Sequence, residues 1–370
     1  NVVFGYEAGQ CMGGSNNFIV GNRAGGQSTA GNYNFIFGAS AGCRVISSSN
    51  ILLGYRAGRD MCNGADNIAM GDNALTGSGT HSNNTGASNI AMGRCALNAI
   101  SDGGYNVSIG RLTGCKTTSG DRNVFVGNYA GEYNTTGDDI VMIGACAGKC
   151  RQSGDTNIAI GKCALLGSST ASNNTGGCNV AIGCGAGNGM TSGNQNVLIG
   201  CVTGAALTTA ERNVYIGTGV AEGSTTGNDN IAIGQYTSPS VSGAYNIHFG
   251  RYAGHQVSSG NHNVIMGAHA ARCHTTGDCN VFIGNEAGSH ASSSGGTGNN
   301  NIGVGCKALT ALTSGYDNTV LGQNAGSSMT SGVDNVLIGR RSGRTLSTNC
   351  RNVFVGAYTG DDATGISNVA

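Results

Sequence analysis

The sequence predicts an all-β fold: a single parallel β-solenoid of about 21 coils of 16–17 residues each. One five-residue box recurs along the whole chain, and 67 of the 370 residues are Gly while only one is Pro. No stretch shows apolar residues at helical spacing over a helical length. So much Gly leaves too few large side chains for one thick core, and collagen would need Gly at every third position with abundant Pro. Short coils that stack on one another satisfy all of these observations.

The box begins with Asn, continues with apolar residues and closes with Gly, as in NVVFG at residue 1, NVFVG at 123 and NVLIG at 335. It occurs twenty-one times, and its closing Gly residues are 16 or 17 apart except for three gaps of 22, 22 and 21. These gaps predict three longer coils of 21–22 residues. β-Branched residues bounded by Asn and Gly are typical of a short strand. We therefore expect residues 1–370 to form one continuous solenoid, excerpted from a longer repeat array.

A single repeat is too small to fold alone. Ordering about 17 residues costs roughly 1–2 kcal/mol each, against about 1.5–3 kcal/mol for each large aliphatic side chain that it buries. Stability must come from stacking, with each box paired in parallel to the next at about 4.8 Å, so that twenty-one coils extend about 100 Å. Gly at the corners permits positive φ, and Asn at the first box position, replaced only by Ile140, predicts a stacked amide ladder.

Alternation along the box predicts which side chains face the coil interior. The second and fourth residues are apolar almost without exception, so we expect them to point inward. The third residue would then face outward, yet it is also apolar in most coils. We predict that this third-residue column is buried against other copies of the chain, in a trimer or a bundled fibre; the alternative is a strand covered on both sides within one coil. The large apolar members of the column are Val3, Ile19, Ile36, Leu52, Phe125, Met142, Leu198, Ile265, Phe282, Val320, Leu337 and Phe354.

Cysteine and asparagine residues suggest covalent modifications. Fifteen Cys without a CxxC pair argue against a metal ribbon. Two pairs occupy equivalent places on adjacent coils and are candidate disulfides, Cys146 with Cys163 and Cys184 with Cys201, although parallel Cβ vectors also allow free thiols. Glycosylation sequons occur at Asn83, Asn106, Asn134 and Asn173. Asn106 heads a box and is expected to be buried, so the candidate sites are Asn83, Asn134 and Asn173, although an Asn- and Thr-rich composition alone also produces such matches.

Several classes of function are excluded by composition and spacing. Nineteen basic and nineteen acidic residues give no electrostatic footprint for nucleic acid, and no apolar run reaches the roughly 18–20 residues of a membrane span. No catalytic constellation, metal signature or cofactor motif stands out, so we expect no enzyme and no cofactor. The start at NVVFG, without an initiator Met or a signal region, suggests a processed or excerpted chain.

The string NVFIGNEAG at residues 280–288, the Thr-Thr-Gly turns and the variant pairs such as Ala74-Leu75 resemble repeats of phage tail-fibre-like proteins. The box is also similar to the head repeats of trimeric autotransporter adhesins. This resemblance implies a trimeric, rod-forming attachment or structural protein that is extracellular, on a cell surface or on a virion. Two departures are that the adhesin repeat is shorter than 17 residues and that neither group is usually so rich in Cys.

Three functions remain open. The first is a structural fibre or shaft that associates with its own copies, with attachment through the long turns at 76–88, 166–178 and 289–300. The second is a rod that binds surface glycans through Tyr33, Tyr105, Tyr245 and Tyr316, which precede boxes. The third is ice binding by a column of turn threonines, Thr118, Thr135, Thr191, Thr208, Thr225, Thr275 and Thr330.

Overall fold

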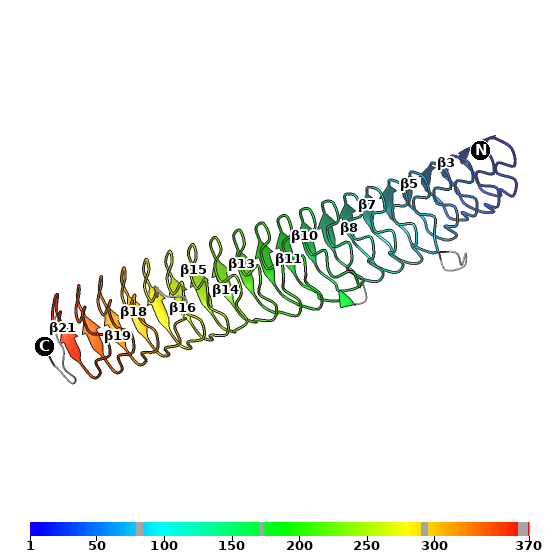
Figure 1. The fold of residues 1–370 in the computed structure, drawn as a ribbon. Coiled ribbons are helices and arrows are strands. Elements are labelled where there is room, and N and C mark those ends of the chain that lie inside the picture. The colour runs from blue at the N-terminus through cyan, green and yellow to red at the C-terminus, as the bar shows by residue number, and fades with distance from the viewer. Residues whose placement is uncertain (79–83, 171–172, 290–294, 362–368, 370) are drawn as a thin grey trace. The chain divides into compact units, whose positions relative to one another are not determined.

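A computed structural model describes residues 1–78, 84–170, 173–289, 295–361 and 369 (Figure 1). It confirms the predicted fold class: twenty-one three-residue strands, paired in parallel, stack as solenoid coils of about 17 residues, and the described residues contain no helix. The chain divides into two compact units, Asn1–Gly193 and Asn194–Ala370. Each unit is described by itself below.

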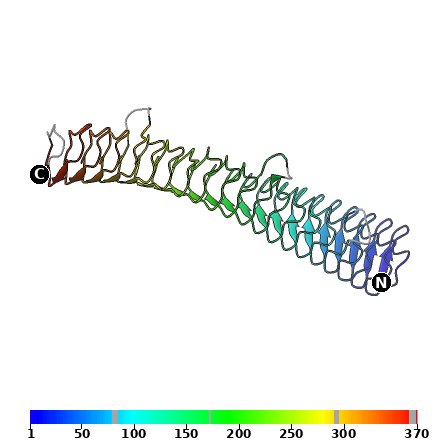
Figure 2. The same ribbon diagram turned by 90° about the horizontal axis from the view of Figure 1, so that it is seen from below.

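Unit 1 holds eleven strands, which form one row along one side of the stack (Figure 2). They are β1 (Val2–Phe4), β2 (Phe18–Val20), β3 (Phe35–Phe37), β4 (Ile51–Leu53), β5 (Ile68–Met70), β6 (Ile90–Met92), β7 (Val107–Ile109), β8 (Val124–Val126), β9 (Val141–Ile143), β10 (Ile158–Ile160) and β11 (Val180–Ile182). Unit 2 holds the remaining ten strands. They are β12 (Val197–Ile199), β13 (Val214–Ile216), β14 (Ile231–Ile233), β15 (Ile247–Phe249), β16 (Val264–Met266), β17 (Val281–Ile283), β18 (Ile302–Val304), β19 (Thr319–Leu321), β20 (Val336–Ile338) and β21 (Val353–Val355).

Within each unit the strands pair in register, box position against the same box position. Phe125 of β8 pairs with Ser108 of β7 and with Met142 of β9. The long coils keep this register, because Ile68 pairs with Ile90 across a separation of 22 residues. The additional residues therefore leave the coil at a turn without shifting the sheet.

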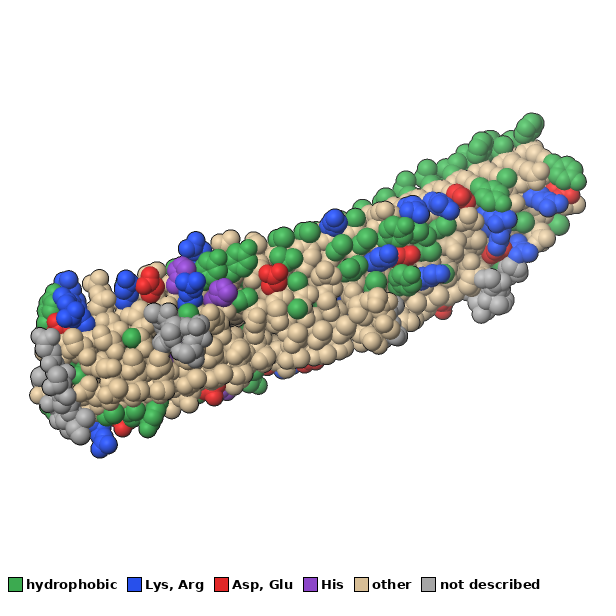
Figure 3. Space-filling model, viewed as in Figure 1, with side chains coloured by type: hydrophobic (Ala, Val, Ile, Leu, Met, Phe, Trp, Pro, Cys, Tyr) green, Lys and Arg blue, Asp and Glu red, His purple; other side chains and the backbone are tan. Residues whose placement is uncertain are grey.

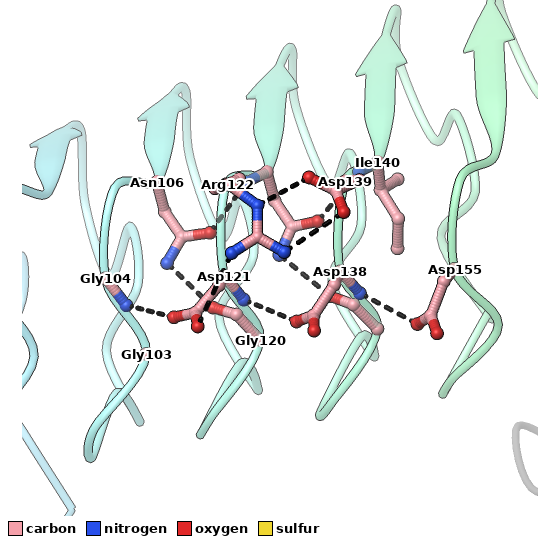
Figure 4. A network of polar contacts seen from close by, with 12 residues as sticks. Gly103, Gly104, Asn106, Gly120, Asp121, Arg122, Asp138, Asp139, Ile140 and Asp155 are labelled. Atoms are coloured by element: carbon pink, nitrogen blue, oxygen red, sulfur yellow. Dashed lines mark hydrogen bonds and ion pairs between the residues drawn. The ribbon is translucent and has the colours of Figure 1, made fainter.

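The predicted asparagine ladder is confirmed beside the strands (Figure 4). The Asn123 backbone N–H donates to Oδ1 of Asn106 at 2.9 Å, and Nδ2 of Asn123 donates to the Gly137 carbonyl at 2.8 Å. Each amide thus satisfies backbone groups of the neighbouring coil, and the ladder side chains are almost fully buried. The Ile140 backbone N–H donates to Asn123 Oδ1 at 3.0 Å, but Ile140 has no side-chain acceptor to extend the ladder.

Glycine is required where the box ends, because two coils approach closely at that turn. Gly127 has φ of 128°, and a Cβ there would lie 2.7 Å from the carbonyl oxygen of Gly144 in the next coil. A side chain at this position would be strained in conformation and would also clash with backbone. The closing Gly of the box is therefore a condition for stacking.

The core of each unit consists of the third box residues, the small residue after the box and one turn position. Ile19, Ile36 and Leu52 in unit 1 are at most 1% exposed, as are Phe282 and Leu337 in unit 2. The predicted orientation of the box is therefore wrong: the third residue points into the coil, and the second and fourth point outward. The burial pattern of the strands, intermediate then buried then intermediate in β8 and β17, records this directly.

The space available inside the coil explains this orientation. A Cβ at Gly131 would lie 2.6 Å from the ring of Phe125, so the turn glycine makes room for the third box residue. Where that third residue is Ala69, Leu75 replaces the turn glycine and is itself fully buried. The same exchange occurs in three further coils. The pairs are Ala91 with Leu97, Ala159 with Leu165, and Gly303 with Leu309.

Candidate functional site

The candidate site is the outward face of the sheet, formed by the second and fourth residues of every box and called here the sheet face. Its forty-two positions are apolar except for Thr319. Many of these side chains are more than a third exposed although they are large. Such members include Phe18 at 38%, Phe35 at 39%, Ile109 at 40%, Ile143 at 38%, Ile182 at 37%, Ile302 at 38% and Ile338 at 36%.

The sheet face is flat and periodic because every rung presents the same two positions. The rings of Phe18 and Phe35, on consecutive strands, stack with centroids 5.0 Å apart and planes 5° apart. This spacing matches the separation of strands in a sheet. A partner that remains in contact along the face must therefore carry a repeat of the same spacing.

A polar border flanks the sheet face in unit 1 (Figure 4). Arg122 Nε donates to Oδ1 of Asp139 at 2.7 Å, and this hydrogen bond lowers the pKa of the Asp139 carboxyl. Next to it, Oδ1 of Asp138 accepts from the Asp121 backbone N–H at 2.7 Å, and Oδ1 of Asp155 accepts from the Asp138 N–H at 2.9 Å. These stacked carboxylates satisfy the backbone of the preceding coil. An apolar centre with a charged border is the composition of a protein–protein interface.

Unit 2 carries the same kind of border. Arg212 Nε donates to Oδ1 of Asp229 at 2.7 Å, and this hydrogen bond lowers the pKa of the Asp229 carboxyl. Both ion pairs join consecutive coils at the residue just before the box. Water screens exposed pairs of this kind, so they contribute little to stability and their main consequence is to define where the apolar surface ends.

The predicted oligomer face does not lie on this surface. Apart from Val3 in the first coil, which is 44% exposed, all its residues are buried inside their own coils. The residues that were predicted to contact other copies, and that are instead buried within their own coil, are Ile19, Ile36, Leu52, Phe125, Met142, Leu198, Ile265, Phe282, Val320, Leu337 and Phe354. Sequence reasoning missed the sheet face because all three central box positions are apolar. The available signal was the exchange of turn Gly for Leu in four coils whose third residue is Ala or Gly.

The predicted disulfides are absent, since all fifteen cysteines lie in the described residues and carry free thiols. Cys146 and Cys163 occupy the same position in consecutive coils, and burial, followed by the proximity of Cys146, raises the pKa of Cys163. Their Cβ atoms belong to parallel, in-register coils, which favours side-by-side thiols over a bond. Cys184 lies in unit 1 and Cys201 in unit 2, and both are exposed.

Two of the three predicted glycosylation sites lie in the described residues. The prediction for Asn134 is wrong, because this side chain is fully buried and donates to the Gly137 carbonyl. Asn173 is exposed in the second long turn, and its glycosylation stays a prediction. Asn83 lies outside the described residues.

The first two long turns leave their coils through the same arrangement. Nδ2 of Asn84 donates to the Asp60 carbonyl of the preceding coil at 2.8 Å, and its Oδ1 accepts from the Ser78 N–H at 3.1 Å. Asn174 repeats both contacts with Cys150 and Ser168. A buried Asn therefore closes the base of each turn.

The predicted glycan-binding tyrosines are accessible. Tyr33, Tyr105, Tyr245 and Tyr316 are 66%, 69%, 56% and 48% exposed. The turn threonines differ from a free hydroxyl array, because Thr118 Oγ1 donates to the Thr135 carbonyl at 3.1 Å and Thr135 Oγ1 donates to the Gln152 carbonyl at 2.9 Å. The tyrosines thus present groups that a ligand can reach, whereas these hydroxyls already bind the next coil.

Within the described part of the chain, no three His, Cys, Asp or Glu side chains are grouped to hold a metal ion. The described residues also contain no helix that is long and apolar enough to cross a membrane. The sequence matches no protein-family model and no curated protein.

Proposed function

We propose that this chain is a non-enzymatic structural protein, the fibre or shaft of an extracellular appendage or virion, whose copies associate through the sheet face. The observation that carries the proposal is the pair of outward apolar columns, interrupted only by Thr319. Extended apolar surfaces on soluble proteins mark sites of association.

The occupant that fits the sheet face best is a second copy of this chain. Its repeat spacing is identical, so apolar side chains of one copy remain opposite those of the other along the whole contact. The eleven rungs of unit 1 and the ten of unit 2, each about 4.8 Å apart and about 10 Å wide, provide about 1,000 Å² in total. A stable interface takes about 800 Å² from each partner.

Charged substitutions on the sheet face test the proposal. We expect the 370-residue chain to have the native mass of an oligomer, and Ile109→Glu with Ile143→Glu to convert it to a monomer, because burying unpaired carboxylates costs several kcal/mol. The circular dichroism spectrum should be unchanged, since both side chains already contact solvent.

Tyr133→Glu is the matched control: Tyr133 is 39% exposed, close to the 38% of Ile143, but lies in a turn. The control should retain the wild-type mass. A monomeric wild type, or a double variant that keeps its oligomeric mass, would contradict association through this face.

A second candidate, binding of surface glycans, is favoured by the exposed tyrosines at box borders. Tyr105 and Tyr33 present most of their side chains to solvent, and aromatic rings have an apolar body with a polar tip. Glycan-array binding that is lost with Tyr33→Ala and Tyr105→Ala, while native mass is retained, would support this function over a purely structural one.

A further inference from the structure

A groove of about 520 Å³ lies among the turns of the first four coils of unit 1, formed by turn residues and no residue of the sheet face. Its charged lining residues are Glu7, Arg23, Arg44, Arg56, Arg59 and Asp60. Four arginines against two carboxylates leave an excess of two positive charges, in a chain whose net charge is +0. Figure 3 shows Lys and Arg side chains gathered near this N-terminal end of unit 1.

Asp60 holds two of the arginines in place. Its carboxylate is 1% exposed and accepts from Arg44 Nη1 at 2.9 Å and from Arg59 Nε at 2.8 Å. Arg44 Nε also donates to Oε1 of Gln27 at 3.0 Å. The two guanidinium groups, with side chains 37% and 35% exposed, are thus fixed before any ligand arrives, and one of their two charges is not balanced by Asp60.

The other two arginines complete the groove from neighbouring coils. Arg23 Nε donates to Oε2 of Glu7 at 2.7 Å, and the Arg23 side chain is 62% exposed. The Arg56 guanidinium lies 4.8 Å from the centre of the Tyr55 ring and has no carboxylate partner among the described residues. Each guanidinium has five N–H donors, so donors in the groove outnumber the acceptors that the chain supplies.

We propose that this groove binds sulfate or phosphate groups. Tetrahedral oxyanions accept several charge-assisted hydrogen bonds at once, and the planar fork of arginine fits them better than a lysine does. Arginines on coils about 4.8 Å apart suit the successive anionic groups of a sulfated glycan as well as one free ion. The proposal does not depend on association through the sheet face.

Calorimetric titration of the 370-residue chain distinguishes the sources of the oxyanion. The probes are a heparin-derived hexasaccharide, its desulfated form, inorganic sulfate and inorganic phosphate. Binding of the sulfated hexasaccharide but not of the inorganic ions supports a glycan ligand. Binding of the inorganic ions with comparable affinity supports a free oxyanion instead. Binding of the desulfated form as tight as that of the sulfated form would overturn the proposal.

Arginine substitutions place the binding in the groove. Arg23→Gln with Arg56→Gln should weaken binding at least about tenfold, because each removes charge-assisted hydrogen bonds. Arg56→Lys, which keeps the charge, should weaken it less. Arg94→Gln is the matched control, an exposed arginine of unit 1 outside the groove, and should change the affinity less than about twofold.

Both Asp60 contacts remain in these variants, so thermal unfolding should be close to wild type. Equal weakening by Arg94→Gln, or equally tight binding of a nucleic acid of the same charge, would show that the attraction is non-specific and would overturn the site. The absence of binding by every probe would do the same.

Discussion

The two sides of one strand differ in what covers them. In β8, Phe125 is fully buried inside the coil, whereas Val124 and Val126 on the other side are only half-buried. The inward column varies from Gly303 to Phe282, because the turn residue opposite adjusts to the space that remains. The outward columns are almost uniformly β-branched or large. The side-chain size varies in the inward column, which indicates that each coil packs its own interior. The outward columns keep the same kind of side chain in every coil, which indicates that the same contact is repeated along the outside.

The largest expected effect is on the inward side of the strand. Phe125→Ala should lower the free energy of unfolding by about 3–5 kcal/mol, because it leaves a cavity that the rigid turn at Gly131 does not fill. Val126→Ala, on the outward side of the same strand, should cost less than about 1 kcal/mol when unfolding is measured for the dissociated chain. Equal losses in a urea titration would contradict the assignment of the two sides.

The next largest loss in the free energy of unfolding is expected from a substitution in the asparagine ladder. Asn123→Ala removes the acceptor of the Ile140 N–H and the donor to the Gly137 carbonyl, both in the interior. The Gly137 carbonyl keeps the Asn134 amide as a donor, so the Ile140 N–H is the buried group left without its partner, and one such group predicts a loss of about 1–3 kcal/mol. Asn128→Ala, an exposed residue four positions beyond β8's first residue, is the control and should stay within about 0.5 kcal/mol.

A histidine in the inward column should make unit 2 sensitive to acid. Burial lowers the pKa of His248 to about 3 from its usual 6.5, and its Nδ1 contacts the Ser238 hydroxyl. Below pH 6.5 the unfolded chain binds a proton at His248 that the folded chain does not bind. The free energy of unfolding therefore keeps its full value from this histidine above pH 6.5 and falls as the pH is lowered towards 3, by up to about 1.4 kcal/mol per pH unit.

The variant His248→Leu with Ser238→Ala should reduce that acid sensitivity. Urea midpoints measured at pH 7 and pH 4 should differ less in the variant than in wild type. An equal difference between the two urea midpoints in the variant and in wild type would show that other groups account for the pH dependence.

The smallest expected effect is a gain in stability. Arg151 lies in the core of unit 1, its Nη2 donates to the Gly176 carbonyl, and its Nε and Nη1 have no partner among the described residues. Burial lowers the pKa of this guanidinium to about 10, so the charge is unfavourable at every lower pH. Arg151→Met should raise the free energy of unfolding by about 1–3 kcal/mol, which a thermal melt would show as a higher melting temperature. Arg94→Met should leave the melting temperature unchanged.

Much of the fold could be predicted from the spacing of a few residues. The box ending in Gly at intervals of 16 or 17 predicted coil length, strand position and register, and those features depend on backbone contacts that only Gly and Asn permit. The position of the long turns followed for the same reason, because Ile68 and Ile90 keep phase across residues 76–88. Of the candidate site, sequence predicted an apolar association surface on the box but placed it on the wrong column.

The sequence by itself thus determined the repeat, the parallel pairing and the Asn ladder. Only the tertiary structure decided which side of the strand faces the interior, because Val124, Phe125 and Val126 are all apolar and alternation gives no preference between them. The decision depends on volume across the coil: a Cβ at Gly288 would lie 2.6 Å from the Phe282 ring, and Leu309 is buried where Gly303 leaves space. Such complementarity joins residues six positions apart, which face each other only once the chain has turned after the closing Gly of the box. It is therefore a property of the closed coil rather than of the strand.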